Sequence, residues 1–288
     1  MTENLLNKVI AVVGPTASGK TSYAIELAKE INGEIVSADS RLVYKGFDIG
    51  TAKPTMEERE GIPHYMIDIV EPEEDYSVGR YVKDAKIVIN DILSRGKTPI
   101  IVGGTGLYIN ALLMNYDFTD AEPDYKLREE LMASDNLYQM LIQLDEETAR
   151  TIEPNDKKKI VRAIEIIKTT GKKILKTMSG SEYNVEWTGR NFPRNELYER
   201  INRRVDLMIE QGLINETKHL LEKHGRIPNL INTIGYQEII SYLDGELTLN
   251  NAIDMLKQNT RRYAKRQLTW FRRNSEIKWN IYPETLKK

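Results

Sequence analysis

Residues 14–21, GPTASGKT, have the form G-x-x-x-x-G-K-[ST] and constrain the fold of this chain more than any other segment. A β-branched run, KVIAVVG (8–14), precedes the motif, and a segment with helical apolar spacing, TSYAIELAKEI (21–31), follows it. Between a strand and a helix, successive backbone N–H groups and the positive end of the helix converge on phosphate oxygens. The motif therefore predicts a phosphate loop of the kind that is typical of ATP-binding proteins.

The residue types of the loop match this role. Gly14 and Gly19 permit the turn, Lys20 adds a positive charge, and the hydroxyl of Thr21 is suited to bind Mg²⁺. We expect phosphate contacts from the whole loop, Gly14, Pro15, Thr16, Ala17, Ser18, Gly19, Lys20 and Thr21.

The first part of the chain alternates strand and helix patterns. Further strands are expected at EIVSADS (34–40), HYMIDIV (64–70) and TPIIVGG (98–104). Helices are expected over about 77–95 and from about residue 105. This alternation predicts an α/β fold, with a P-loop NTPase-like parallel sheet core and helices on both faces.

The pattern then changes to helices. Residues 119–185 show no strand candidate and are expected to form a small all-helical insertion domain. Around residues 185–195 we expect an irregular stretch, and at 277–282 a last strand. The core would then consist of residues 1–118 and 186–288, the latter mainly helical.

Composition excludes several classes of protein. Among 288 residues, 40% are hydrophobic and 29% charged, as in globular domains. No apolar run is long enough to span a membrane, and the N-terminus lacks a signal-peptide pattern. With no cysteine and three histidines, disulfides and a thiolate or histidine metal centre are not expected. We expect a cytoplasmic protein.

Positive charge is clustered although the net charge is −2. Residues 157–176 contain eight Lys or Arg and one acid, Glu165, and residues 261–273 contain six Lys or Arg and no acid. Such runs indicate either a surface that faces a polyanion or a solvated helix face, and the pattern leaves both open. The apolar side chains of the second run are expected to face the core, at Tyr263, Leu268, Trp270 and Phe271.

The ligand of the phosphate loop is not fixed by the loop alone. An ATPase has a second strand that ends in an acid, whereas the 98–104 strand ends in glycines. The strand expected at 34–40 does carry an acid near its end, Asp39, but Ser40 and Arg41 follow at once, so Asp39 is placed to act as a base or substrate ligand rather than as a hydrolytic metal ligand. Its alternative role is to cap the following turn.

Several segments together resemble one family, the tRNA dimethylallyltransferases (tRNA isopentenyltransferases), in their bacterial form. The resemblance spans nearly the whole chain and includes NDKKKIVRAIE (155–165) and IGYQEIISYLDG (234–245). Its most specific motifs lie in SADSRLVYKGFDIGTAKP (37–54) and YAKRQLTWFRR (263–273). The chain has no cysteine for the zinc module of some eukaryotic relatives.

The resemblance implies an activity. The family transfers a dimethylallyl group from dimethylallyl diphosphate to N6 of adenine 37, next to the tRNA anticodon. The phosphate loop would then bind the donor's diphosphate with Mg²⁺. Asp39 matches the family's catalytic base, Thr16 a residue near the reacting carbon, and Arg204 an arginine on the diphosphate.

The resemblance also implies a tRNA-binding set. It consists of Asp39, Ser40, Arg41, Leu42, Thr105, Arg128, Lys158, Lys159, Ile160, Val161 and Arg162. Lys159 departs from the family's frequent arginine, and Thr105 could instead cap the next helix. The expected partners are the anticodon stem-loop and the prenyl donor, bound by a monomer.

The residues by themselves leave three alternative functions open. One is a small-molecule or nucleotide kinase, which the loop alone would support. The second is a nucleotide-gated RNA-binding module without chemistry, and the third is a prenyltransferase for free adenine nucleotides. Asp39 beside the loop argues against the second, and the basic helical insertion argues against the other two.

Overall fold

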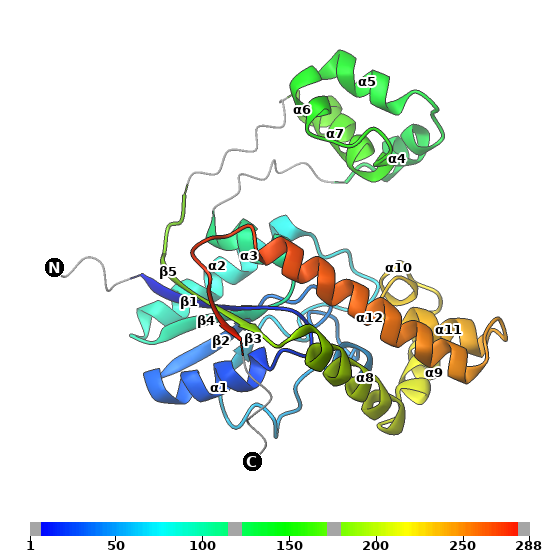
Figure 1. Cartoon of the computed structure of the whole chain (residues 1–288). Coiled ribbons are helices and arrows are strands. Elements are labelled where there is room, and N and C mark those ends of the chain that lie inside the picture. Colours follow the sequence, from blue (N-terminus) through cyan, green and yellow to red (C-terminus); the bar gives the residue numbers. More distant parts are fainter. Residues whose placement is uncertain (1–6, 115–122, 172–179, 282–288) are drawn as a thin grey trace. The chain divides into compact units, whose positions relative to one another are not determined.

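The computed structural model describes residues 7–114, 123–171 and 180–281. The chain divides into two compact units, residues 1–114 with 181–288 and residues 115–180 (Figure 1). The first unit contains the β-sheet, and the described part of the second is helical. The second unit starts and ends a few residues before the expected insertion domain, 119–185.

Six strands form one sheet, in which every pairing is parallel. Their order is β3-β2-β4-β1-β5-β6. The strands are β1 (Lys8–Val13), β2 (Gly33–Ser37), β3 (His64–Tyr65), β4 (Thr98–Gly103), β5 (Asn184–Asn191) and β6 (Lys278–Ile281). The predicted parallel α/β sheet and its last strand are confirmed.

The expectation of an irregular stretch around 185–195 is wrong, because β5 lies there and its residues 184–189 pair with β1. Along β5, exposed or half-buried residues alternate with buried ones such as Trp187, as on a strand near the sheet edge. The polar half of this alternation hid the strand. At the other edge β3 is shorter than expected, since Met66 and Asp68 have positive φ values that end the strand.

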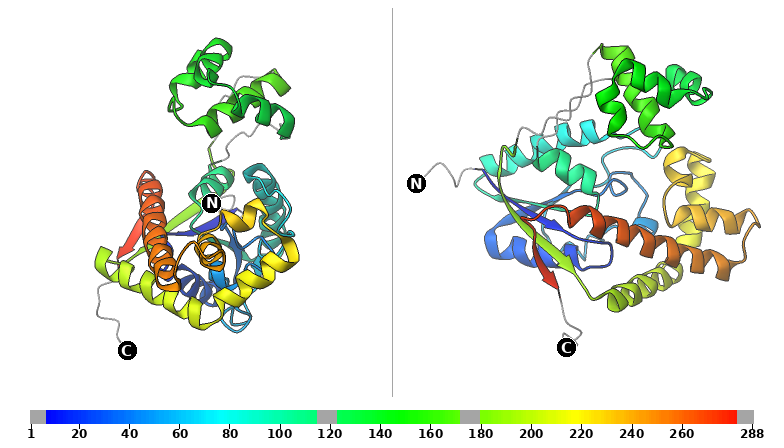
Figure 2. Two further views of the ribbon diagram at one scale, coloured as in Figure 1. Left: turned by 90° about the vertical axis from the view of Figure 1, so that its right-hand side faces the viewer. Right: turned by 45° about the horizontal axis from the view of Figure 1, so that its top comes forward.

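Within its described residues, the first unit contains eight α-helices, in the parts of the sequence where helices were expected (Figure 2). They are α1 (Lys20–Ile31), α2 (Val78–Ser94), α3 (Gly106–Leu113), α8 (Arg194–Glu210), α9 (Leu213–His224), α10 (Pro228–Ile231), α11 (Tyr236–Leu243) and α12 (Leu249–Phe271), with a 3₁₀ turn, η2 (Ile49–Thr51).

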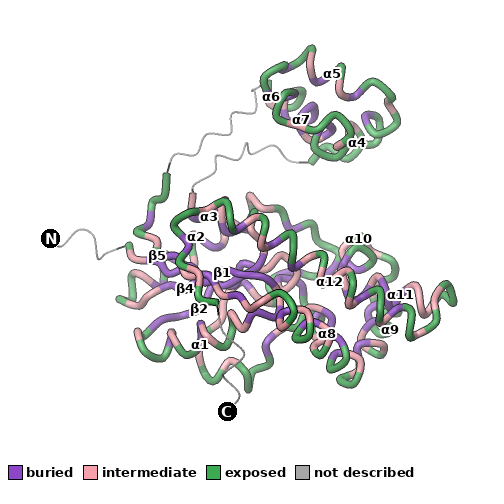
Figure 3. The backbone as a smooth tube through the Cα atoms, viewed as in Figure 1, coloured by how far each residue is buried: buried purple, intermediate pink, exposed green. Residues whose placement is uncertain are grey.

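The two faces of the sheet belong to different apolar clusters, since side chains alternate along a strand. Ile10 and Val12 of β1 pack with α1, whereas Val9, Ala11 and Val13 pack with α2, α3, α11 and α12. β1 and β4 are buried almost throughout (Figure 3). Each fully buried Val or Ile contributes roughly 1.5–3 kcal/mol of transfer free energy, so these strands are a rigid base for the loops at their carboxyl ends.

The second unit contains four described helices with their own apolar core, in which Leu141 and Ile164 are fully buried. These helices are α4 (Tyr125–Met132), α5 (Leu137–Leu144), α6 (Glu146–Arg150) and α7 (Lys157–Thr170). Aspartates at positions 124, 145 and 156 cap α4, α6 and α7 through backbone N–H groups. In the part of the chain that the structure describes, no helix is both long and apolar enough to cross a bilayer.

Candidate active site

The phosphate loop has the conformation that anion binding requires. Gly14, Ala17 and Gly19 have φ values of 149°, 63° and 73°, so the backbone turns and brings N–H groups to one side. A Cβ on Gly14 would lie 2.2 Å from the carbonyl oxygen of Arg190, so a side chain there would collide with the backbone just past the pairing of β1 and β5. No side chain caps α1, and the N–H groups of its first turn therefore remain available to an anion.

Lys20 is half-buried, and its ammonium donates to the carbonyl oxygen of Pro15 at 2.6 Å. Loss of hydration and, to a smaller extent, the nearby positive charge of Arg204 lower the pKa of Lys20 to about 7, while Asp39 opposes the shift. Lys20 therefore lies close enough to Asp39 and Arg204 for their charges to change its pKa, although these residues are 19 and 165 positions apart along the chain (20 to 39, 39 to 204).

Two arginines of α8 contact the loop. Nη1 of Arg204 lies 3.4 Å from Oγ1 of Thr16, and Nε of Arg200 donates to the carbonyl oxygen of Ala17 at 2.9 Å. Burial and the neighbouring Arg200 lower the pKa of Arg204, which shows that the positive charges oppose one another. An anion with several charges would relieve this repulsion. Arg200 was missed from sequence, although its four-residue spacing from Arg204 places both on one helix face.

The loop after β2 carries the expected base. One oxygen of Asp39, Oδ1, accepts the N–H of Arg41 at 2.8 Å, so the predicted turn-capping role is present and uses that oxygen. The N–H of Ser40 donates to Oγ1 of Thr105 at 3.0 Å. Thr105 occupies the N-cap position of α3 but makes no side-chain cap there. It holds the Asp39 loop instead.

Gln267 of α12 was also missed. It is 5% exposed and spans two loops, with Oε1 accepting the N–H of Thr16 at 2.8 Å and Nε2 donating to the carbonyl oxygen of Gly104 at 3.0 Å. The sequence signal was a polar residue at a position where the helix spacing of Ala264 and Phe271 calls for a buried side chain. Of the aromatic and apolar residues expected in the core, Phe271 is buried, whereas those at 263, 268 and 270 are half-buried.

The second unit holds the other expected tRNA contacts. Lys158 and Lys159 are exposed on α7, and Lys159 pairs with Asp156 at 2.5 Å. Ile160 and Val161, of the same expected stretch, are 1% and 4% exposed in the helical core, and their contact with tRNA stays a prediction.

Arg128 and Arg162 converge on one buried acid. Nε and Nη2 of Arg128 bind the two carboxylate oxygens of Glu165 at 2.9 and 3.1 Å, and Nη1 of Arg162 binds one of them at 2.5 Å. Glu165 is fully buried. The single acid of the basic run thus fixes two arginines and joins α4 to α7.

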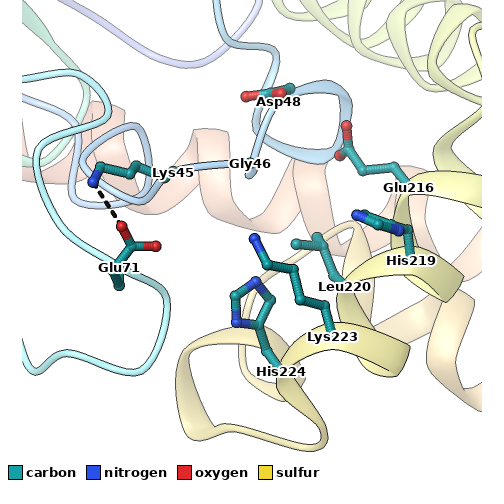
Figure 4. Close-up of a pocket in the computed structure, with 9 residues that line it drawn as sticks. All are labelled: Lys45, Gly46, Asp48, Glu71, Glu216, His219, Leu220, Lys223 and His224. Carbon is teal, nitrogen blue, oxygen red and sulfur yellow. Dashed lines mark hydrogen bonds and ion pairs between the residues drawn. The ribbon is translucent and has the colours of Figure 1, made fainter.

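A hollow of about 520 Å³ lies elsewhere in the first unit (Figure 4). It is lined by Lys45, Gly46, Asp48, Glu71, Glu216, His219, Leu220, Lys223 and His224. Lys45 pairs with Glu71 at 2.6 Å, and Glu216 accepts the N–H groups of Ile49 and Gly50 at 2.8 and 2.9 Å. Glu216 thus holds the first two residues of η2, and none of the lining residues belongs to the phosphate loop.

The donor set around the loop fits one kind of metal. Nowhere in the described ranges do three or more His, Cys, Asp or Glu residues gather as metal ligands. Thr21 is exposed in the first turn of α1 and offers one hydroxyl oxygen. Such a site suits Mg²⁺, which keeps most of its waters and takes its remaining ligands from phosphates.

A phosphate loop on a parallel sheet, ringed by cations and facing a carboxylate, defines an enzyme of the P-loop class that acts on a phosphorylated ligand. The family model described as "IPP transferase" matches residues 42–274, and the model "Isopentenyl transferase" matches residues 7–71. The chain belongs to the tRNA dimethylallyltransferase family.

Individual relatives match nearly the whole chain. A tRNA dimethylallyltransferase of Anoxybacillus flavithermus is 49% identical over 94% of this chain and 89% of its own length. The crystal structure of a Bacillus halodurans tRNA isopentenylpyrophosphate transferase superposes with a TM-score of 0.74 at 46% identity, covering 96% of this chain and 90% of that one. A eukaryotic dimethylallyltransferase acting on tRNA gives 0.87 at 31% identity, covering 98% and 75%.

Proposed function

We propose that this chain transfers a dimethylallyl group from dimethylallyl diphosphate to N6 of adenine 37 of tRNA, giving N6-(dimethylallyl)adenosine and diphosphate. The observation that carries the proposal is the joint placement of Lys20, Arg204 and Asp39 around the phosphate loop. The cations suit a leaving group, and the carboxylate suits a nucleophile whose proton must be removed.

On the donor side, the bond between the prenyl carbon and the diphosphate oxygen breaks, and negative charge grows on the diphosphate. Lys20, Arg204 and the loop N–H groups are donors fixed before the reaction begins, so they stabilise this charge without reorganising. Thr16 belongs to the loop, and its hydroxyl, which lies beside Arg204, would border the reacting carbon. Thr21 would hold Mg²⁺, which supplies further charge neutralisation when bound.

On the acceptor side, the exocyclic amine is a weak nucleophile because its lone pair is delocalised into the ring. Asp39 would accept a proton from N6 as the new carbon–nitrogen bond forms. A base inside an anticodon loop must leave the stack to reach this carboxylate. Ser40, Arg41 and Leu42 are half-buried beside Thr105 and would border the flipped base.

RNA contacts of the helical unit would come from its exposed cations, Lys158 and Lys159, and from Arg128 and Arg162, which are half-buried. Because Glu165 neutralises one positive charge of the arginine pair, the pair keeps one net positive charge toward phosphate. We further propose that the enzyme acts as a monomer in the cytoplasm.

One assay separates this function from the kinase alternative. The protein is incubated with Mg²⁺, labelled dimethylallyl diphosphate and unmodified tRNAs that read codons beginning with U. Label in the tRNA is the expected result, and free adenine nucleotides in a parallel tube should remain unlabelled. ATP turnover without prenyl transfer would refute the proposal. The β4 strand ends at Gly103 without the acid that hydrolytic P-loop enzymes place there, which favours the transferase.

A further inference from the structure

A buried glutamine on α12 connects the two loops of the active site. Gln267 lies on the stripe of α12 that also buries Ala264 and Phe271. A buried amide loses its hydration, and an apolar side chain of equal size would fill this place at lower cost. A glutamine suits such a place when one nearby backbone group needs an acceptor and another needs a donor. Gln267 provides both.

The bond to the phosphate loop orients Thr16. Because the N–H of Thr16 points to Oε1 of Gln267, this group does not face the anion site. The side chain of the same residue then lies beside Arg204. Gln267 therefore determines which face of Thr16 is presented to the donor.

The second bond reaches the acceptor side. Nε2 of Gln267 donates to the carbonyl oxygen of Gly104, and the next residue, Thr105, accepts the N–H of Ser40 beside Asp39. The contact is close-fitting, since a Cβ on Gly104 would lie 2.1 Å from Nε2. One side chain thus links the loop that holds the leaving group to the loop that carries the base.

We propose that Gln267 is a positioning residue for prenyl transfer, which holds the phosphate loop and the Asp39 loop in register through Thr16 and Gly104. This inference rests on the proposed function for its turnover measurements. Gln267 would act through Thr16 and Gly104, so its loss would change where the groups of the two loops lie.

The test is a double-mutant cycle. Gln267→Ala removes both bonds, and Gly104→Ala displaces the amide from the other side while leaving Gln267 in place. Each single variant should raise the KM for dimethylallyl diphosphate by about tenfold or more, the cost of a lost buried hydrogen bond. In the double variant the Gly104 change should add little, because the atom it displaces is gone. The KM for tRNA should stay within about twofold.

Three controls make the cycle decisive. Gln258→Ala, an exposed position on the same helix, should leave donor KM unchanged. Thermal melting separates unfolding from misplacement, and Gln267→Met, which keeps the side-chain volume, replaces the alanine variant if that one does not fold. Equilibrium titration with dimethylallyl diphosphate reads donor binding even if no prenyl group reaches tRNA, so failure of the proposed function remains distinguishable.

Two results would overturn the proposal. One is a fall in melting temperature with donor KM and donor affinity unchanged, which would make Gln267 purely structural. The other is full additivity of the two substitutions in donor KM, which would mean that Gly104 and Gln267 act separately.

Discussion

Lys20 is expected to give donor binding a pH dependence near neutrality. Its pKa in the empty site is about 7, so about nine tenths of the molecules carry the charge at pH 6 and about one tenth at pH 8. A bound diphosphate favours the charged ammonium and raises this pKa. Below pH 7 the charge is present before the donor arrives, and above pH 7 binding must first recover a proton. The kcat/KM for the donor should therefore fall about tenfold per pH unit above 7.

The assay is a set of initial rates at saturating tRNA with varied dimethylallyl diphosphate between pH 6 and 9. Because kcat reports the bound enzyme and kcat/KM the free enzyme, kcat should show no matching decline over this range. Lys20→Arg is the control, since a guanidinium stays charged throughout. Titration of the donor itself affects both proteins equally. A flat kcat/KM for the unaltered enzyme, or the same decline in Lys20→Arg, would refute the argument.

Three further substitutions test other parts of the structure. Asp39→Asn keeps an acceptor for the N–H of Arg41 but removes the base, so kcat should fall by a factor of about 10²–10⁴. The affinity for tRNA, measured by filter binding, should change by no more than a few-fold. A large loss of affinity would make Asp39 a recognition residue. Glu165→Gln removes the buried counter-charge of Arg128 and Arg162, and urea unfolding should show a loss of about 3 kcal/mol in the free energy of unfolding. Glu216→Gln replaces the carboxylate that accepts the N–H groups of Ile49 and Gly50 in η2, and thermal melting should report a loss of about 1–2 kcal/mol. An unchanged urea unfolding curve for the Glu165 variant, or an unchanged melting curve for the Glu216 variant, would contradict the assigned contacts.

Local signals predicted much of the fold. The runs in β1 and β4 are apolar on both faces, and buried parallel strands need such runs. α1 begins directly after the glycine of the phosphate loop, and α2 begins after Ser77, whose side chain accepts the N–H of Arg80. β5 was not predicted, because a strand near the sheet edge is half polar and no local rule separates such a segment from a loop.

The sequence by itself determined the phosphate loop, the sheet that carries it and, through Asp39 and its motif, the family. Those features depend on interactions between residues that are neighbours in the chain, so the order of the residues is enough to predict them. Tertiary structure alone decided which distant groups complete the site. Gln267 meets Thr16 across 251 positions, and Arg200 meets Ala17 across 183. Hydrogen bonds of this kind depend on how α8 and α12 pack against the sheet, and packing directions are set by the whole core rather than by any one segment.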